Sequence, residues 1–107
     1  MNTNQITEIL SQNKAEQIQV FHTKEYICET VIIATSLNSV HAFSLSEKIV
    51  LFVKDFGQNC IIDGDSKDGW IAIEIPFIST ILHIMIQEKR EYYNIEEILQ
   101  KKWKVVN

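Results

Sequence analysis

The chain has 107 residues, of which 46% are hydrophobic and 22% charged, and its formal net charge is −4. This size and composition predict a single domain, residues 1–107, that buries a core without disulfide or metal staples. The negative charge disfavours nucleic acid and anionic membranes as partners and favours a basic one. Residues 1–5 lack the features of a secretory signal, and the apolar stretch 77–86 is too short to span a membrane. We therefore expect a cytoplasmic protein, whose oligomeric state the sequence leaves open.

The first element is a helix. Ile6, Ile9 and Leu10 lie on one side of a helix over residues 3–12, with polar residues elsewhere. The following residues, 13–22, fit two structures: Ile18 and Val20 alternate as in a strand, whereas Ala15, Ile18 and Phe21 continue a helical spacing. The sequence does not decide between strand and helix for these residues.

The middle of the chain gives conflicting signals. From Thr23, a suitable N-cap, apolar residues recur at spacings of three and four as far as Leu37, which predicts a helix. The β-branched residues 30–33 favour a strand instead. Residues 47–56 pose the same conflict, and for them a strand is slightly preferred over a helix ended by Gly57.

A β-hairpin is predicted near residues 60–75. Two apolar runs, 60–62 and 70–75, flank the turn-rich residues 63–69. The alternation of a strand places Ile71, Ile73 and Ile75 on a core face and Trp70, Ala72 and Glu74 on the opposite face.

Two helices are predicted after the hairpin. Pro76 suits the first turn of a helix over residues 77–86, and Asn94 with Glu97 resembles the start of a final helix that ends at the lysines of 101–104. The expected fold class is therefore α+β: one small domain with helices packed on a small antiparallel sheet that includes the hairpin.

No catalytic, cofactor or metal motif is visible. Cys28 and Cys60 are too few for a disulfide framework and fit buried thiols, and the histidines at 22, 41 and 83 have no zinc-ligand spacing. The hairpin loop matches a calcium loop only in part, because Lys67 and Asp68 occupy positions that need a ligand and a glycine. We expect no catalytic residue, no metal and no cofactor.

The remaining signal is an acidic surface with aromatic residues, a combination typical of protein interfaces. The candidate partner-binding residues form one group on the hairpin and a second group upstream: Asp63, Asp65, Asp68, Trp70 and Glu74, and Glu25, Tyr26 and Glu29. The simpler reading is that these acidic groups only keep the domain soluble.

A small, acidic, one-domain chain without a motif resembles bacterial immunity proteins, which neutralise toxins used between competing cells. The resemblance implies an inhibitor without enzymatic activity that occludes a cognate toxin, commonly a basic nuclease, with its acidic surface. A cysteine-dependent enzyme and a structural or regulatory domain that self-associates through residues 77–86 are the alternatives.

Overall fold

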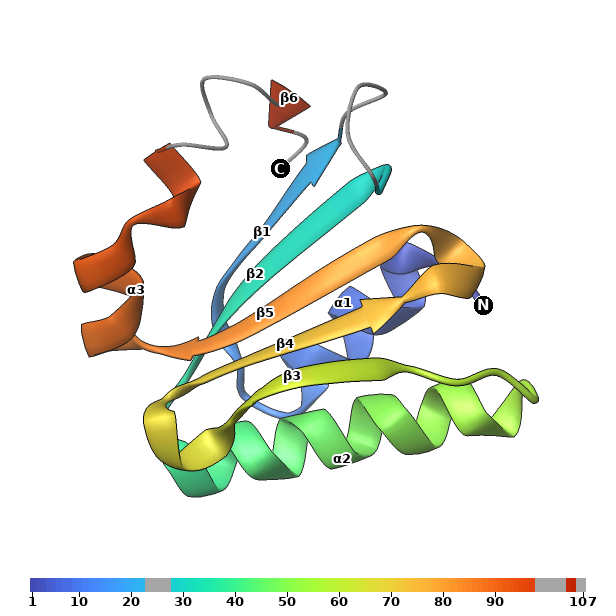
Figure 1. Cartoon of the computed structure of the whole chain (residues 1–107), viewed down its shortest axis with the longest axis horizontal. Helices are drawn as coiled ribbons and strands as arrows, with labels where there is room; N and C mark the ends of the chain where they lie inside the picture. The colour runs from blue at the N-terminus through green and yellow to red at the C-terminus, as the bar shows by residue number, and fades with distance from the viewer. Residues whose placement is uncertain (23–27, 98–103, 106–107) are drawn as a thin grey trace.

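The structure is a computed structural model that describes residues 1–22, 28–97 and 104–105. Figure 1 shows one twisted sheet with helices packed against it. In chain order the elements are α1 (Thr3–Gln12), β1 (Glu16–His22), β2 (Thr30–Ser36), α2 (Ser39–Asp55), β3 (Ile61–Asp65), the 3-10 turn η1 (Ser66–Asp68), β4 (Trp70–Ile75), the 3-10 turn η2 (Pro76–Ile78), β5 (Thr80–Ile86), α3 (Gln87–Tyr93) and β6 (Lys104–Val105).

The strand order in the sheet is β3-β4-β5-β2-β1-β6. The hairpin predicted near residues 60–75 is the antiparallel pair β3 and β4, with Ile62 opposite Ile73. The α+β class is confirmed. The sheet is mixed, however, because its central pair, β2 and β5, runs parallel, from Thr30 opposite Thr80 to Ser36 opposite Ile86.

The two faces of the sheet are covered unequally. Helices α1 and α2 pack on one face and bury the main core, which includes Ile6, Leu45, Ile49, Ile73 and Ile84. Figure 1 looks onto the other face, with α1 behind the sheet and α2 along its lower edge. A smaller buried cluster there consists of Phe21, Cys28, Val31, Ile33 and Met85. Helix α3 packs at one end of that face, which we call the open face.

Two of the predicted elements are found as expected. Helix α1 has the predicted bounds and begins with a capping box, in which the Asn2 side chain accepts from the Gln5 N–H and the Gln5 side chain accepts from the Asn2 N–H. In β4, Ile71, Ile73 and Ile75 are buried. Residues 16–22, left open between helix and strand, form strand β1.

The helix predicted from Thr23 to Leu37 is wrong in its described part, since residues 30–36 form β2 and residues 23–27 lie outside the described residues. All seven residues of β2 are buried. A strand covered on both faces is apolar throughout, so it also contains apolar residues at helical spacing. The β-branched run was the informative signal.

The strand preferred for residues 47–56 is also wrong, because they form the second half of α2. The helix begins much earlier, at Ser39, and is capped by Asn38, whose side chain accepts from the His41 N–H. Its buried residues, Ala42, Leu45, Ile49 and Val53, follow helical spacing over the whole element. Within residues 47–56 alone both periods fit, and the helical one becomes clear only over the full length of α2.

The helix predicted over residues 77–86 is a 3-10 turn followed by β5. Pro76 begins the turn, but Ser79 takes a left-handed conformation, φ 49°, which ends it. The predicted final helix differs too. Helix α3 ends at Tyr93 with Asn94 as its C-cap, and residues 95–97 are helical. Residues 98–103 lie outside the described residues, and Lys104 is in a strand. Among the described residues, no helix is long and apolar enough to cross a membrane.

Candidate functional site

The open face is built from alternate residues of three neighbouring strands. In the register of the sheet, Trp70 lies opposite Met85, Ala72 opposite His83, and Glu74 opposite Ile81. Because successive side chains of a strand point to opposite faces, these residues share the face that carries the smaller buried cluster. Most of them are only half-buried, including Trp70, Ala72, Glu74, Ile81 and His83.

Aromatic rings form a continuous row from the sheet onto α3. The Trp70 indole Nε1–H donates to Nδ1 of His83 at 3.0 Å. The Trp70 ring lies 4.8 Å from the Tyr93 ring, centroid to centroid, and the Tyr93 ring lies 4.9 Å from that of Tyr92. These separations are those of favourable tilted and edge-on aromatic pairs. We call His83, Trp70, Tyr93 and Tyr92 the aromatic row.

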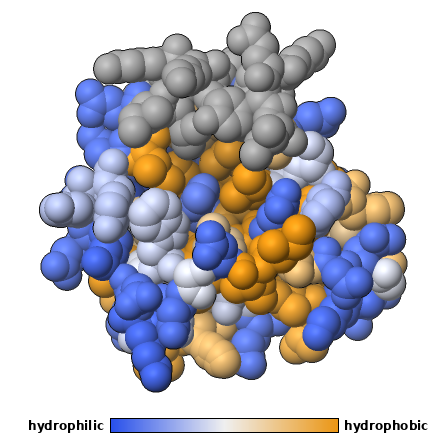
Figure 2. All heavy atoms as spheres, viewed as in Figure 1, coloured by the Kyte–Doolittle hydropathy of each residue, from blue (hydrophilic) through white to orange (hydrophobic). Residues whose placement is uncertain are grey.

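Much of this apolar surface reaches solvent. Tyr92 is 79% exposed, Tyr93 44%, and Ile61, at the sheet edge next to β4, 57%. Figure 2 shows apolar side chains gathered over the middle of this face, with polar residues on either side. Contiguous apolar surface with a polar border is the usual sign of a protein interaction site.

The predicted acidic group borders the aromatic row. Asp63 and Asp65 lie on β3, opposite Ala72 and Trp70, and Asp68 lies in the turn η1. All three aspartates are exposed. Asp65 has a structural task as well, because its Oδ1 accepts from the Lys67 N–H at 2.9 Å and caps the turn. The hairpin thus joins the predicted acidic residues to an aromatic face, and we call the three aspartates the acidic rim.

The second predicted group is not assembled in the same way. Glu29 is exposed and its backbone N–H donates to the Ser79 Oγ at 3.0 Å, near the start of β5. Glu25 and Tyr26 lie outside the described residues. Thr80, the first residue of β5, pairs with Ile75 at the end of β4, whereas Trp70 is the first residue of β4. Glu29 is therefore separate from the aromatic row.

Two glycines shape the tip of the hairpin. Gly64 has φ 92°, and a Cβ on it would lie 2.5 Å from the carbonyl oxygen of Trp70. Gly69 has φ 77°, and its Cβ would lie 2.7 Å from Cδ1 of Ile86. Both positions combine a left-handed backbone with close packing, which only glycine tolerates. The glycine positions therefore fit the turn that the sequence predicted for this segment.

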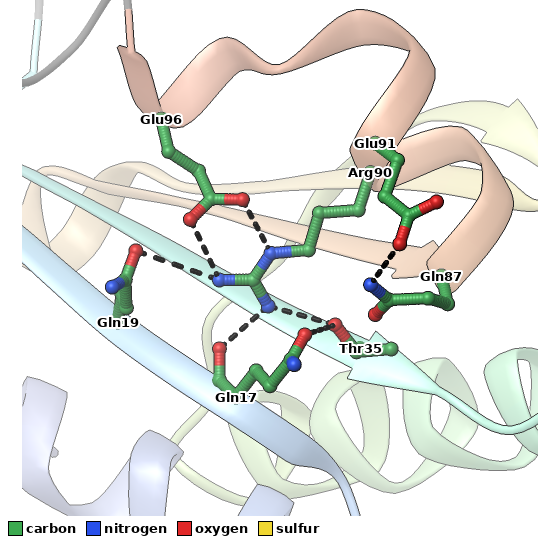
Figure 3. A network of polar contacts seen from close by, with 7 residues as sticks. All are labelled: Gln17, Gln19, Thr35, Gln87, Arg90, Glu91 and Glu96. Carbon is green, nitrogen blue, oxygen red and sulfur yellow. Dashed lines mark hydrogen bonds and ion pairs between the residues drawn. The ribbon is translucent and has the colours of Figure 1, made fainter.

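A polar network around Arg90 fastens α3 to the sheet (Figure 3). This arginine is 3% exposed. Its Nε donates to Glu96 Oε1 at 2.6 Å, and Nη2 donates to Glu96 Oε2 at 3.2 Å. Nη1 donates to the Gln17 carbonyl oxygen at 2.5 Å and to Thr35 Oγ1 at 2.7 Å, while Nη2 also donates to Gln19 Oε1 at 3.5 Å. The five contacts use the five N–H groups of the guanidinium.

Sequence reasoning missed both the network and the role of α3. The contacts of Arg90 with Gln17, Gln19 and Thr35 join residues more than fifty positions apart, and no local pattern reports them. The informative signal was the residue type alone: this is the one arginine in a chain that otherwise uses lysine. Arginine suits a buried site with several acceptors because its donors are fixed in a plane.

The surroundings of both cysteines disfavour the ionised thiol. Burial raises the pKa of the Cys28 thiol, and the charge of Glu74 raises it further, against a lowering by a backbone hydrogen bond with Thr30. Burial also raises the pKa of Cys60. A raised pKa disfavours the thiolate, the reactive form. No three His, Cys, Asp or Glu side chains within residues 1–22, 28–97 and 104–105 are grouped to hold a metal.

These features define a small α+β domain with one helix-covered sheet face and one open, aromatic face bordered by carboxylates. The family follows from comparison with known proteins. Residues 2–106 match the model of the family described as ribosomal silencing factor during starvation. Since the match spans nearly the whole chain, the protein belongs to that family.

Solved structures share the fold. A crystal structure of a protein from Bacillus halodurans has a TM-score of 0.81 at 17% sequence identity, covering 98% of this chain and 95% of that one. A crystal structure of a protein from Chromobacterium violaceum has a TM-score of 0.82 at 20% identity, covering 92% and 82%. At these identities the likeness establishes the fold.

The family corrects the functional prediction. The resemblance to immunity proteins is wrong, and with it the inhibitor function and the toxin partner. Small size and net negative charge are shared by many unrelated domains, so they carry no family information. The helix over residues 77–86 on which the self-association alternative depended is not formed, because residues 80–86 are β5, which is paired on both sides, by β4 and β2.

Proposed function

We propose that this chain silences translation by binding a protein of the large ribosomal subunit, uL14, through its open sheet face. The observation that carries the proposal is the aromatic row, three rings of which come from Trp70, Tyr92 and Tyr93, next to the exposed acidic rim. Exposed tryptophan and tyrosine are frequent anchors of binding energy in protein interfaces.

Charge supports a protein partner over ribosomal RNA. The chain carries a net charge of −4, and three exposed aspartates border the face. Phosphate groups are repelled by such a surface, whereas the basic surface of a ribosomal protein is attracted to it. The acidic rim accelerates the encounter and the aromatic row supplies the buried contact.

In this proposal the protein acts in the cytoplasm as a binding regulator and not as an enzyme. Both cysteine thiols have raised pKa values, which argues against a cysteine nucleophile. Silencing then needs only occupancy: the bound protein covers ribosomal surface that translation requires.

The test is binding of the purified protein to isolated large ribosomal subunits, together with inhibition of translation in a reconstituted system. The informative variant is the double substitution Asp63→Lys with Asp68→Lys, two exposed residues of the acidic rim. We expect its association rate at low salt to fall roughly 10-fold and its inhibition of translation to weaken in step, because steering by opposite charge is lost.

The matched control is Glu47→Lys with Asp55→Lys, which makes the same change in net charge on exposed positions of α2, the helix that covers the other face. We expect this variant to bind nearly as the unmodified protein does. Failure of the unmodified protein to bind large subunits would refute the function. Equal losses in both double variants would refute the open face as the docking surface.

A further inference from the structure

The contact between Trp70 and His83 fixes which imidazole nitrogen carries a proton. An indole N–H can only donate a hydrogen bond. Nε1 of Trp70 lies 3.0 Å from Nδ1 of His83, so Nδ1 accepts and has no proton. In the neutral ring the proton is therefore on Nε2.

His41 shows the same arrangement with both nitrogens used. Its Nδ1 accepts from the Leu37 N–H at 2.9 Å, and its Nε2–H donates to the Asn13 carbonyl oxygen at 2.7 Å. For His83, no residue within 1–22, 28–97 or 104–105 accepts from Nε2. His83 is half-buried on the open face, so this donor lies on the surface proposed for docking.

The neighbours of His83 select the kind of acceptor. Ala72 lies opposite it on β4 and Ile33 opposite it on β2, so both strand partners are apolar. Asp63 lies on β3, opposite Ala72, and Glu74 lies on β4, two residues after Ala72. These carboxylates disfavour a second negative charge, and a neutral main-chain carbonyl fits the site better. Burial lowers the pKa of His83 to about 4, so the ring is neutral at neutral pH.

We propose that His83 donates a hydrogen bond from Nε2 to a main-chain carbonyl of the bound partner, with Trp70 holding the ring in the tautomer that this bond needs. The proposal rests on the proposed function, since it assigns a specificity-determining donor to the same face. It makes Trp70 a positioning residue as well as a contact.

The first experiment needs no partner. Nitrogen NMR of the imidazoles in the folded protein distinguishes protonated from unprotonated ring nitrogens at neutral pH. We expect His83 to show an unprotonated Nδ1 and a protonated Nε2, and Trp70→Phe to release the ring into a mixture of tautomers. The reverse assignment in the unmodified protein, or an unchanged tautomer in Trp70→Phe, overturns the proposal.

The second experiment measures binding to isolated large ribosomal subunits. His83→Phe keeps a ring but has no donor, whereas His83→Gln offers an oxygen to Trp70 and an N–H outward. We expect His83→Phe to bind about 10-fold more weakly, because a buried carbonyl is left unpaired, and His83→Gln to recover most of the affinity. Thermal unfolding of both variants verifies that each is folded at the temperature used.

The outcomes separate this proposal from the function. Absence of binding by the unmodified protein refutes the function itself. Binding by the unmodified protein with equal affinity for His83→Phe refutes the donor and leaves the function standing. Equal weakening of His83→Phe and His83→Gln also refutes the donor, because the glutamine retains an N–H.

Discussion

Two polar groups on the open face, the Arg90 network and the pair Trp70–His83, differ in how fully their hydrogen-bonding atoms are used. The five N–H groups of Arg90 make contacts within the protein, to Glu96, Thr35, Gln17 and Gln19. His83 uses one nitrogen, toward Trp70, among the described residues. A group whose hydrogen bonds are all made within the protein stabilises the fold. A group on the same face with an unused donor can bond to a partner.

The difference also explains how the site is built. The Arg90 network joins α3 to β1 and β2, and α3 carries Tyr93, whose ring packs on Trp70. The Arg90 network therefore positions Tyr92 and Tyr93, the half of the aromatic row that lies on α3. Trp70 and His83, on the sheet, form the other half. Three measurements test this division.

The largest effect is expected for Arg90→Met. Removal of the guanidinium leaves Thr35 and a backbone carbonyl without their donor and Glu96 without its ion pair, so the free energy of unfolding should fall by about 3 kcal/mol. Urea denaturation at neutral pH measures it. Lys48→Met, at an exposed position of α2, is the control and should change stability little. Equal losses in the two variants would show that the network anchors nothing.

Acid should destabilise the protein through His83. Its pKa is lowered from 6.5 to about 4 by burial, so between these pH values the unfolded chain binds the proton and the folded protein does not. Stability is then complete above about pH 6.5 and is lost as the pH falls toward 4, by about 2.5 kcal/mol at pH 4.5.

The control for this pH dependence is His83→Gln, which has no titrating ring. The difference in unfolding free energy between the two proteins, measured from about pH 7 to 4.5, cancels the contribution of the carboxylates. A difference that stays constant over this range would show that His83 titrates normally and is not desolvated.

A smaller effect on binding is expected for Tyr93→Ala. The tyrosine is 44% exposed and packs on Trp70, so its removal should weaken binding to large subunits roughly 10-fold with little loss of stability. Phe77→Ala is matched to it, because Phe77 is a 59% exposed aromatic residue outside the aromatic row. Equal binding by the two variants would place the docking surface elsewhere.

The sequence predicted those parts of the fold whose signals are local. The capped helix α1 and the hairpin follow from a single amphipathic period and from glycine-rich turn chemistry. The buried strands β2 and β5 were read as helices because an apolar run contains both periods, and tertiary pairing decided between them. Family membership was established by comparison with known proteins, whereas charge and size gave no information about it.

The candidate site was predicted in part for the same reason. Trp70 and the acidic rim lie within one hairpin, so their closeness in the sequence grouped them. The helix predicted over residues 77–86 concealed the position of His83, which strand alternation places with Ile81 and Met85. Arg90 and Tyr93 reach the site through contacts between distant segments, which a single sequence does not reveal.

The parallel pairing of β2 with β5 has a consequence for how the chain folds. These central strands join residues 30–36 to residues 80–86, with α2 and the hairpin between them. Pairs of such long sequence separation form slowly, because the entropy of closing a large loop is lost before the contacts form. During synthesis the central pair cannot be completed until residue 86 has left the ribosome, so a shorter nascent chain lacks the complete open face.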